Sequence, residues 1–310
     1  MIHINPVFFE NYNCVQSIIA NILHYRNQPW SPMFMGELGF TYEKTANNGF
    51  TLDTGSKDMQ VLDHLYGITE IPLKIKSLDE LKSALSCERW ICLYVDGYIC
   101  PWHTAYHKQH IDHYLLIIGI DKSEQSIICA DPFFTSEIQR LPYRDIEWTN
   151  KSIELKVMNK PFSYENIFPF FRSIIQELIS STVPYWIIIK EFSDYLSLEG
   201  MERELFSYQD CAFINWLISV NFLSKARKNF VESLIYISKK NKFCPAHIAD
   251  AFSQLSEEWM KLKICLLKYY YKKNATYQSL QAVKSHLTVL ADMEEHCVDI
   301  LYKQLQNVVK

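Results

Sequence analysis

The feature that most constrains the fold is a change of pattern close to residue 160. Before it, short runs rich in isoleucine, leucine, valine and tyrosine mix with helical patterns; after it, β-type runs and glycines are scarce. Mixed runs ahead of a purely helical stretch are typical of an α+β domain followed by an all-helical one. We therefore predict two domains, residues 1–160 with mixed structure and residues 161–310 with helices alone.

Apolar spacings of three and four residues predict the helices, and short runs of branched and aromatic residues predict the strands. In the first domain the expected helices are 14–25, 57–66 and 77–85. The expected strands there are 90–95, 113–120, 126–130 and 152–158, with a hairpin turn at 121–125. In the second domain the expected helices are 167–180, 208–222, 225–239, 245–271 and 277–309.

The bulk composition argues against several classes of protein. Hydrophobic residues make up 48% and charged residues 21% of the 310 positions, as in a soluble globular chain. A formal net charge of −4 argues against general nucleic-acid binding, and the longest apolar runs are too short to cross a bilayer. No leader pattern opens the sequence, and nine irregularly spaced cysteines form no C-x-x-C pair. We expect a cytoplasmic protein with reduced thiols and with no nucleic-acid or membrane partner.

Three positions in the first domain are candidates for chemistry, and the first is Cys14. The stretch "ENYNCVQSIIANILHY" places it at the start of an expected helix, just after Asn11 and Asn13, both good capping residues. The positive end of a helix dipole favours a thiolate, and backbone N–H groups at a helix start point outward toward a developing oxyanion. Taken alone, a cysteine in this position is also compatible with a buried or capping role.

His113 and Asp131 are the second and third candidates. His113 opens an expected strand in "HIDHYLLIIGID", and Asp131 ends the next one in "SIICADPFF", where Pro132 stops the strand. If the two runs form a hairpin, neighbouring strands bring the carboxylate close to the imidazole that it would orient. Each residue alone is also typical of an ordinary strand end. Together with Cys14 they supply a nucleophile, a base and an orienting group.

A competing constellation is the histidine-rich stretch "CPWHTAYHKQHIDH". It holds five possible metal ligands: Cys100, His103, His107, His110 and His113. Spacings of three and four would present pairs of them on a helix. Pro101 and the polar and aromatic neighbours favour a loop instead, and the run contains no glutamate to serve as a base. We therefore predict no metal site, and a metal hydrolase stays an alternative.

At these residues the chain resembles a known family. The stretches "NCVQSIIANILHY…GELGFTY" and "HYLLIIGID…ICADPFF" resemble the N-terminal domain of the butirosin biosynthesis protein H family, over about residues 8–140. The stretches "RKNFVESLIYISK" and "LSEEWMKLKICLLKYY" are similar to the helical C-terminal domain that such proteins often carry. The resemblance implies a papain-like, C39-peptidase-like cysteine-nucleophile domain followed by an all-helical domain.

The resemblance also implies an acyltransferase of antibiotic biosynthesis. An acyl group on the phosphopantetheine thiol of an acyl or peptidyl carrier protein would pass to Cys14 and then to a small amine acceptor. That acceptor would be an aminoglycoside or a small diamine. Carried over to this sequence, Cys14 becomes the nucleophile, His113 the base and acid, and Asp131 the orienting carboxylate. No resident cofactor or metal is implied.

The chain departs from the family pattern ahead of the cysteine. Peptidases of the C39 type place a glutamine several residues before it as an oxyanion donor, whereas this chain has Val7, Phe8 and Phe9 there. The nearest amides are Asn11 and Asn13, so these side chains or backbone N–H groups are the candidates for that role. Aromatic residues near the motifs are candidates for an apolar acyl pocket, and each is also compatible with ordinary core: Phe9, Tyr12, Trp102, Tyr106 and Phe133.

Two further functions stay open at this point. A cysteine peptidase or thioesterase of the same fold would use the same three side chains with water as the acceptor. The sequence alone does not separate it from the transferase. A non-catalytic binding module, in which the helical domain docks a partner, predicts that Cys14→Ala leaves function intact.

Overall fold

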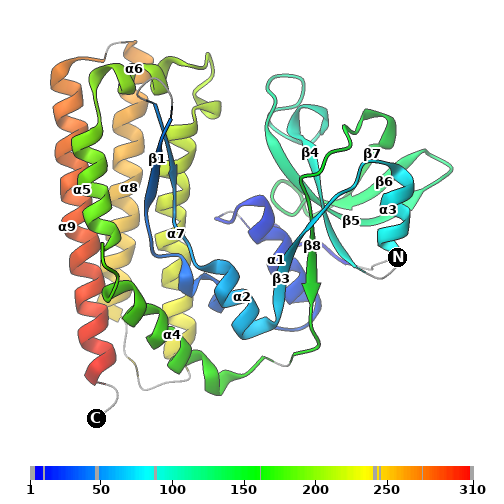
Figure 1. Ribbon diagram of the computed structural model, residues 1–310, viewed down its shortest axis with the longest axis horizontal. Coiled ribbons are helices and arrows are strands. Elements are labelled where there is room, and N and C mark those ends of the chain that lie inside the picture. Colours follow the sequence, from blue (N-terminus) through cyan, green and yellow to red (C-terminus); the bar gives the residue numbers. More distant parts are fainter. Residues whose placement is uncertain are drawn as a thin grey trace. The chain divides into compact units, whose positions relative to one another are not determined.

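The computed structural model describes residues 4–9, 11–45, 49–86, 89–160, 162–239, 243, 246–273 and 275–307. The chain divides into two compact units, shown in Figure 1. The first consists of Met1–Trp30 and Leu62–Phe162, and the second of Ser31–Val61 and Ser163–Lys310. The predicted class is confirmed at this level, because a mixed α+β region with a sheet is followed by a helical C-terminal part.

The first unit is built on a six-stranded sheet. The strand order is β3–β8–β4–β5–β6–β7, and every neighbouring pair is antiparallel. The strands are β3 (Ile68–Leu73), β4 (Trp90–Asp96), β5 (Asp112–Asp121), β6 (Ser126–Ala130), β7 (Ile138–Pro142) and β8 (Ser152–Val157). The helices of this unit are α1 (Cys14–Tyr25) and α3 (Leu78–Leu85), while α2 (Asp58–Tyr66) crosses the division between Val61 and Leu62.

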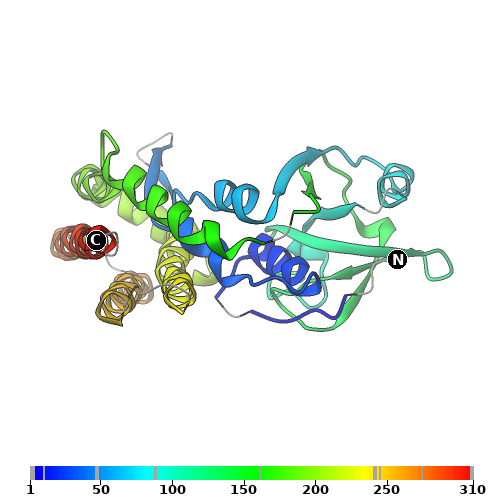
Figure 2. The same cartoon turned by 90° about the horizontal axis from the view of Figure 1, so that it is seen from below.

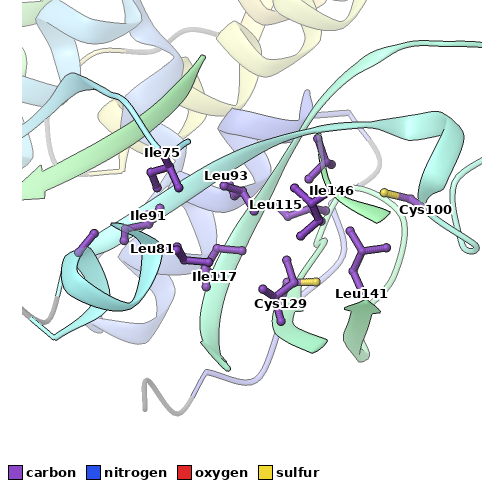
Figure 3. Packing of buried hydrophobic residues seen from close by; sticks show 13 residues of the cluster. Ile75, Leu81, Ile91, Leu93, Cys100, Leu115, Ile117, Cys129, Leu141 and Ile146 are labelled. Atoms are coloured by element: carbon purple, nitrogen blue, oxygen red, sulfur yellow. The ribbon is translucent and has the colours of Figure 1, made fainter. Parts of the chain in front are cut away.

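A cluster of aliphatic side chains fills the core of this unit (Figure 3). On β5, Leu115 and Ile117 both belong to this cluster, since alternate residues of a strand point to the same face. Burying one such side chain contributes roughly 1.5–3 kcal/mol. His113 precedes Leu115 by two positions and therefore shares that face of β5. The core thus fixes the strand that carries the candidate base.

Long helices form the second unit. They are α4 (Tyr164–Ile179), α5 (Tyr185–Tyr195), α6 (Leu198–Phe206), α7 (Asn215–Ser238), α8 (Ala246–Lys272) and α9 (Tyr277–Asn307). Helix α8 packs against both α7 and α9, and α5 packs against α9. Figure 2 looks along α7, α8 and α9, which are seen end on.

A β-hairpin also belongs to the second unit. Its strands are β1 (Thr41–Lys44) and β2 (Phe50–Asp53), which pair antiparallel. The Phe50 ring lies 4.9 Å from the ring of Phe192 and 5.1 Å from that of Trp216, measured between centroids. These aromatic contacts explain why residues 31–61 group with the helices, although the expected helical domain covered residues 161–310 alone.

Other elements differ from the expected ones in detail. The structure adds β1, β2, β3, β7, α5 and α6, and it joins the expected helices 208–222 and 225–239 into α7. The expected helices 245–271 and 277–309 correspond to α8 and α9, and residues 245, 308 and 309 lie outside the described residues. Of the nine cysteines, the seven that the structure describes are free thiols.

Candidate active site

Cys14 is the first residue of α1, and a capping box fixes the start of that helix. The Asn13 side-chain oxygen accepts a hydrogen bond from the Gln16 backbone N–H at 2.8 Å. In return the Gln16 side chain accepts one from the Asn13 N–H at 3.1 Å, so the first turn is tied from both sides. Buried isoleucines on the inner face of α1 hold the helix, which contacts β5. The Cys14 thiol is half-buried, so it remains accessible.

His113 lies near the start of β5, where its register partner on β4 is Val95. Asp131 directly follows β6, which pairs with β5 as the hairpin pattern predicts. Its backbone carbonyl accepts hydrogen bonds from the N–H groups of Phe134 and Thr135, which turn the chain away from the sheet. The two side chains meet because their strands are neighbours, and both are buried, with exposed fractions of 2% and 0%.

The structure brings the three predicted residues together around one imidazole. His113 Nε2 lies 2.7 Å from Asp131 Oδ2, and the Cys14 thiol makes a side-chain hydrogen bond with the same histidine. Because Nε2 is engaged by the carboxylate, Nδ1 is the ring nitrogen that remains for the thiol. A carboxylate that holds one nitrogen of a base leaves the other nitrogen aimed at the nucleophile.

The charge balance of this set favours a protonated histidine. Burial lowers the pKa of His113, but its hydrogen bonds to Asp131 and Cys14 and their negative charges outweigh burial and raise the pKa to about 9. An imidazolium beside a thiol at a helix N-terminus stabilises the thiolate, which is the nucleophilic form of cysteine.

The amides proposed as oxyanion donors lie directly ahead of α1. The Asn13 side-chain oxygen is committed to the helix cap, as described above. Asn11 lies in the turn before it and is half-buried. An α-helix leaves its first backbone N–H groups without intrahelical partners. The N–H groups at the start of α1 are therefore the other candidates for the oxyanion role.

Two of the candidate pocket residues, Phe9 and Tyr12, come just before Cys14 in the sequence. The Phe9 ring stacks on Tyr12 at 4.8 Å between centroids and lies 5.4 Å from the Trp30 ring. Tyr12 is only 3% exposed, so it is part of a packed cluster rather than an open wall.

The other three candidates lie on the side of the base. Phe133 is 6.3 Å from the His113 ring, whereas Tyr106 stacks on His107 and is exposed. Trp102 has a more specific contact, because its indole N–H donates a hydrogen bond to Asp131 Oδ2 at 2.7 Å.

A second histidine next to the base was seen in the sequence only as a possible metal ligand. His103 is buried, and its ring meets that of His113 edge-on at 4.9 Å. Burial, with a smaller effect from the charge of His113, lowers the pKa of His103 to about 4, so it is neutral at pH 7. Its Nδ1 accepts a hydrogen bond from the Ala105 N–H at 2.9 Å. The spacing of the histidines in the sequence does not reveal the contact between the rings of His103 and His113.

The histidine-rich stretch forms a loop, as its proline and polar residues predict. Tyr98 stacks on His110, and the His110 Nδ1 lies 2.5 Å from Asp96 Oδ2. Within the described residues, no group of three or more histidine, cysteine, aspartate or glutamate side chains is arranged to hold a metal ion.

A scan of protein-family models finds no match to this chain, and a search of curated proteins finds none either. Among the helices of the described residues, none combines the length and apolar character needed to span a membrane. Function is therefore inferred from the residues of the site and from the resemblance of their motifs.

Proposed function

We propose that this protein is a cysteine-dependent acyltransferase whose first domain is papain-like, of the C39-peptidase type. One observation carries the proposal: a single buried imidazole contacts the Asp131 carboxylate at 2.7 Å and makes a hydrogen bond with the Cys14 thiol. A half-buried thiol at a helix start, beside a base that a buried carboxylate orients, is the arrangement that nucleophilic catalysis requires.

In the first half-reaction, the Cys14 thiolate attacks the carbonyl carbon of an acyl thioester. A bond forms between this carbon and the Cys14 sulfur, and the negative charge that develops on the oxygen is suited to the N–H groups at the start of α1. The bond to the donor sulfur then breaks, and the His113 imidazolium gives its proton to the departing thiolate. One thioester replaces another, so this step is nearly balanced in free energy.

In the second half-reaction, a neutral amine attacks the acyl carbon on Cys14. His113, now neutral, takes the proton that the amine nitrogen loses, and the bond to the Cys14 sulfur breaks. The products are an amide and the regenerated thiolate–imidazolium pair. A thioester and an amine thus yield an amide and a thiol without ATP.

The identity of donor and acceptor is supported by the resemblance. The donor we propose is an acyl group on the phosphopantetheine of an acyl or peptidyl carrier protein. The acceptor we propose is an aminoglycoside or small diamine in antibiotic biosynthesis. The aromatic side chains beside the base, with Phe134 at 5.6 Å from the His113 ring, support acyl transfer because an apolar site limits competition by water.

The test uses short acyl thioesters of N-acetylcysteamine as donors and intact mass as the readout. We expect one acyl group on the parent protein and none on Cys14→Ala. The control is Cys211→Ala, which removes another half-buried thiol and should leave the adduct unchanged.

Adding candidate amines should then discharge the acyl group as an amide. Discharge to the free acid alone would favour the peptidase or thioesterase alternative. An adduct that persists in Cys14→Ala, or no adduct and no thioester cleavage in the parent, would contradict the proposal.

A further inference from the structure

The loop that joins β4 to β5 is fixed at its base by one carboxylate. Asp96 Oδ1 accepts hydrogen bonds from the backbone N–H groups of Tyr98 at 2.9 Å and Ile111 at 3.0 Å. The Gly97 N–H donates to the Ile111 carbonyl at 2.8 Å, which closes the two ends of the loop against each other. Residues 97–111 therefore form a closed loop, and its inner part is held in place beside the candidate active site.

The inner part of this loop reaches the orienting carboxylate. Trp102 Nε1 and His113 Nε2 each lie 2.7 Å from the same oxygen, Asp131 Oδ2. The other oxygen, Oδ1, is buried and has no hydrogen-bond partner among the described residues. Both contacts therefore fall on one oxygen of the carboxylate, and the Trp102 N–H is the one that comes from the loop.

The burial of Asp131 makes the hydrogen bond from the Trp102 N–H important. Asp131 is fully buried, and burying a carboxylate costs free energy unless hydrogen bonds replace its contacts with water. A hydrogen bond to a charged group is roughly twice as strong as one between neutral groups. His103 and Cys14 contact His113 and not the carboxylate: the ring of His103 meets that of His113 edge-on, and the Cys14 thiol makes a hydrogen bond with His113. Within this set, Trp102 alone donates to the carboxylate without taking part in proton transfer.

We propose that Trp102 is a positioning residue of the active site, whose indole N–H holds the Asp131 carboxylate in the one orientation that aims His113 at Cys14. This inference rests on the proposed function of the three residues. It assigns to Trp102 a role distinct from lining an acyl pocket.

The test measures the rate at which iodoacetamide alkylates Cys14 between pH 5 and pH 9, with the modified cysteine located by peptide mass. In Trp102→Phe the ring remains and the N–H is lost. We expect alkylation at pH 6 to slow about tenfold, and the acid side of the profile to move up by about one pH unit. The control is Trp148→Phe, which removes another partly buried indole of the same unit and should stay within about twofold of the parent.

A double-mutant cycle separates positioning from a general packing effect. In an Asp131→Ala background, Trp102→Phe should have no further effect on the rate, because the oxygen that accepts from the Trp102 N–H is gone. Site-specific replacement of Trp102 by benzothienylalanine keeps the shape of the indole without the N–H, so it serves if Trp102→Phe fails to fold. A parent-like profile for the analogue, or an equal slowing in the Asp131→Ala background, would overturn the inference.

Alkylation needs no acyl donor, so the two proposals can fail separately. A profile that depends on Trp102, with no acyl adduct from any thioester, would count against acyl transfer alone. An acyl adduct on Cys14 with a profile independent of Trp102 would count against this inference alone.

Discussion

Each unit of the protein buries a carboxylate that accepts a hydrogen bond from a tryptophan N–H and lies beside a cationic side chain. In the first unit Asp131 is held by Trp102 and His113, and in the second Glu294 is held by Trp259 at 2.8 Å and Arg227 at 2.8 Å. The Tyr185 hydroxyl donates to the second oxygen of Glu294 at 2.7 Å, whereas the second oxygen of Asp131 has no partner within the described residues.

The cation decides what each carboxylate can do. A guanidinium stays protonated at any pH that the protein survives, so the Arg227–Glu294 pair is a fixed contact. Both side chains are fully buried, and Arg227 also donates to the Gly39 carbonyl at 2.8 Å, which ties the segment before the hairpin to the helices. An imidazole can give up its proton, and His113 makes a hydrogen bond with a half-buried thiol. Similar surroundings thus produce a structural tie in one unit and, under the proposed function, a proton-transfer group in the other.

The two carboxylates can be compared by changing each into its amide. The largest expected effect is that of the change at Asp131. Asp131→Asn keeps the side-chain shape but removes the charge that orients His113, so acylation of Cys14 should slow about 10³–10⁴-fold. Stopped-flow thioester cleavage measures this rate. If Asp131→Asn instead lost stability and kept activity, Asp131 would be a structural tie like Glu294.

The matched change in the second unit should act on stability. Glu294→Gln leaves the buried Arg227 charge without its partner, and removing one member of such a pair costs about 3–5 kcal/mol. Urea unfolding followed by circular dichroism measures the loss. Thioester cleavage per folded molecule should stay within about twofold of the parent, and a selective loss of activity without a loss of stability would break the comparison.

The pH dependence of stability tests the cationic partner of Asp131, which is His113. The pKa of His113 is about 9 in the folded protein, above its ordinary value of 6.5. This group therefore contributes stability that is fully present below pH 6.5 and is lost as the pH rises through 9, amounting to about 3 kcal/mol. Urea unfolding of the parent and of His113→Gln at pH 6 and pH 9 should show a smaller difference at pH 9. An equal difference at both values would contradict the charged histidine.

The smallest expected effect concerns the cap of the nucleophile helix. Asn13→Ala removes the side chain that accepts from the Gln16 N–H, and the loss of such a cap costs about 1 kcal/mol of stability. Asn11→Ala, in the turn ahead of the cap, is the comparison variant. A larger loss of Cys14 acylation in Asn13→Ala than its stability change explains would indicate that the Asn13 amide also acts on the oxyanion.

The parts of the fold that the sequence predicted have strong local signals. Helix α1 matches the expected 14–25, because two asparagines and a clear apolar period mark its start and its inner face. Strand β6 matches 126–130 as well. By contrast, β3 is an edge strand with Pro72 inside it, and its mostly exposed residues give little alternation.

Elements that depend on distant contacts were not predictable in the same way. The expected break near residue 224 falls inside α7, because the Ser224 hydroxyl bonds to the Ser256 carbonyl of α8 at 2.9 Å and lies buried between two helices. The contact of His113 with Asp131 could be anticipated from strand order, whereas the place of Cys14 beside them was expected from the family resemblance. The bond from Trp102 to Asp131 could not, since nothing in the loop sequence shows where an indole N–H points.

The hairpin of residues 31–61 has a consequence for how the protein is made. In the sequence it follows α1 and precedes the strands of the first unit, but it contacts helices far along the chain. The Ser219 hydroxyl, for instance, bonds to the Leu52 carbonyl, 167 residues away. During synthesis, Phe40 and Phe50 leave the ribosome long before Phe192, Trp216 and Trp259, which cover them in the folded unit. The nascent chain therefore exposes an aromatic segment until most of the helices have emerged, a period in which chaperone binding would limit aggregation.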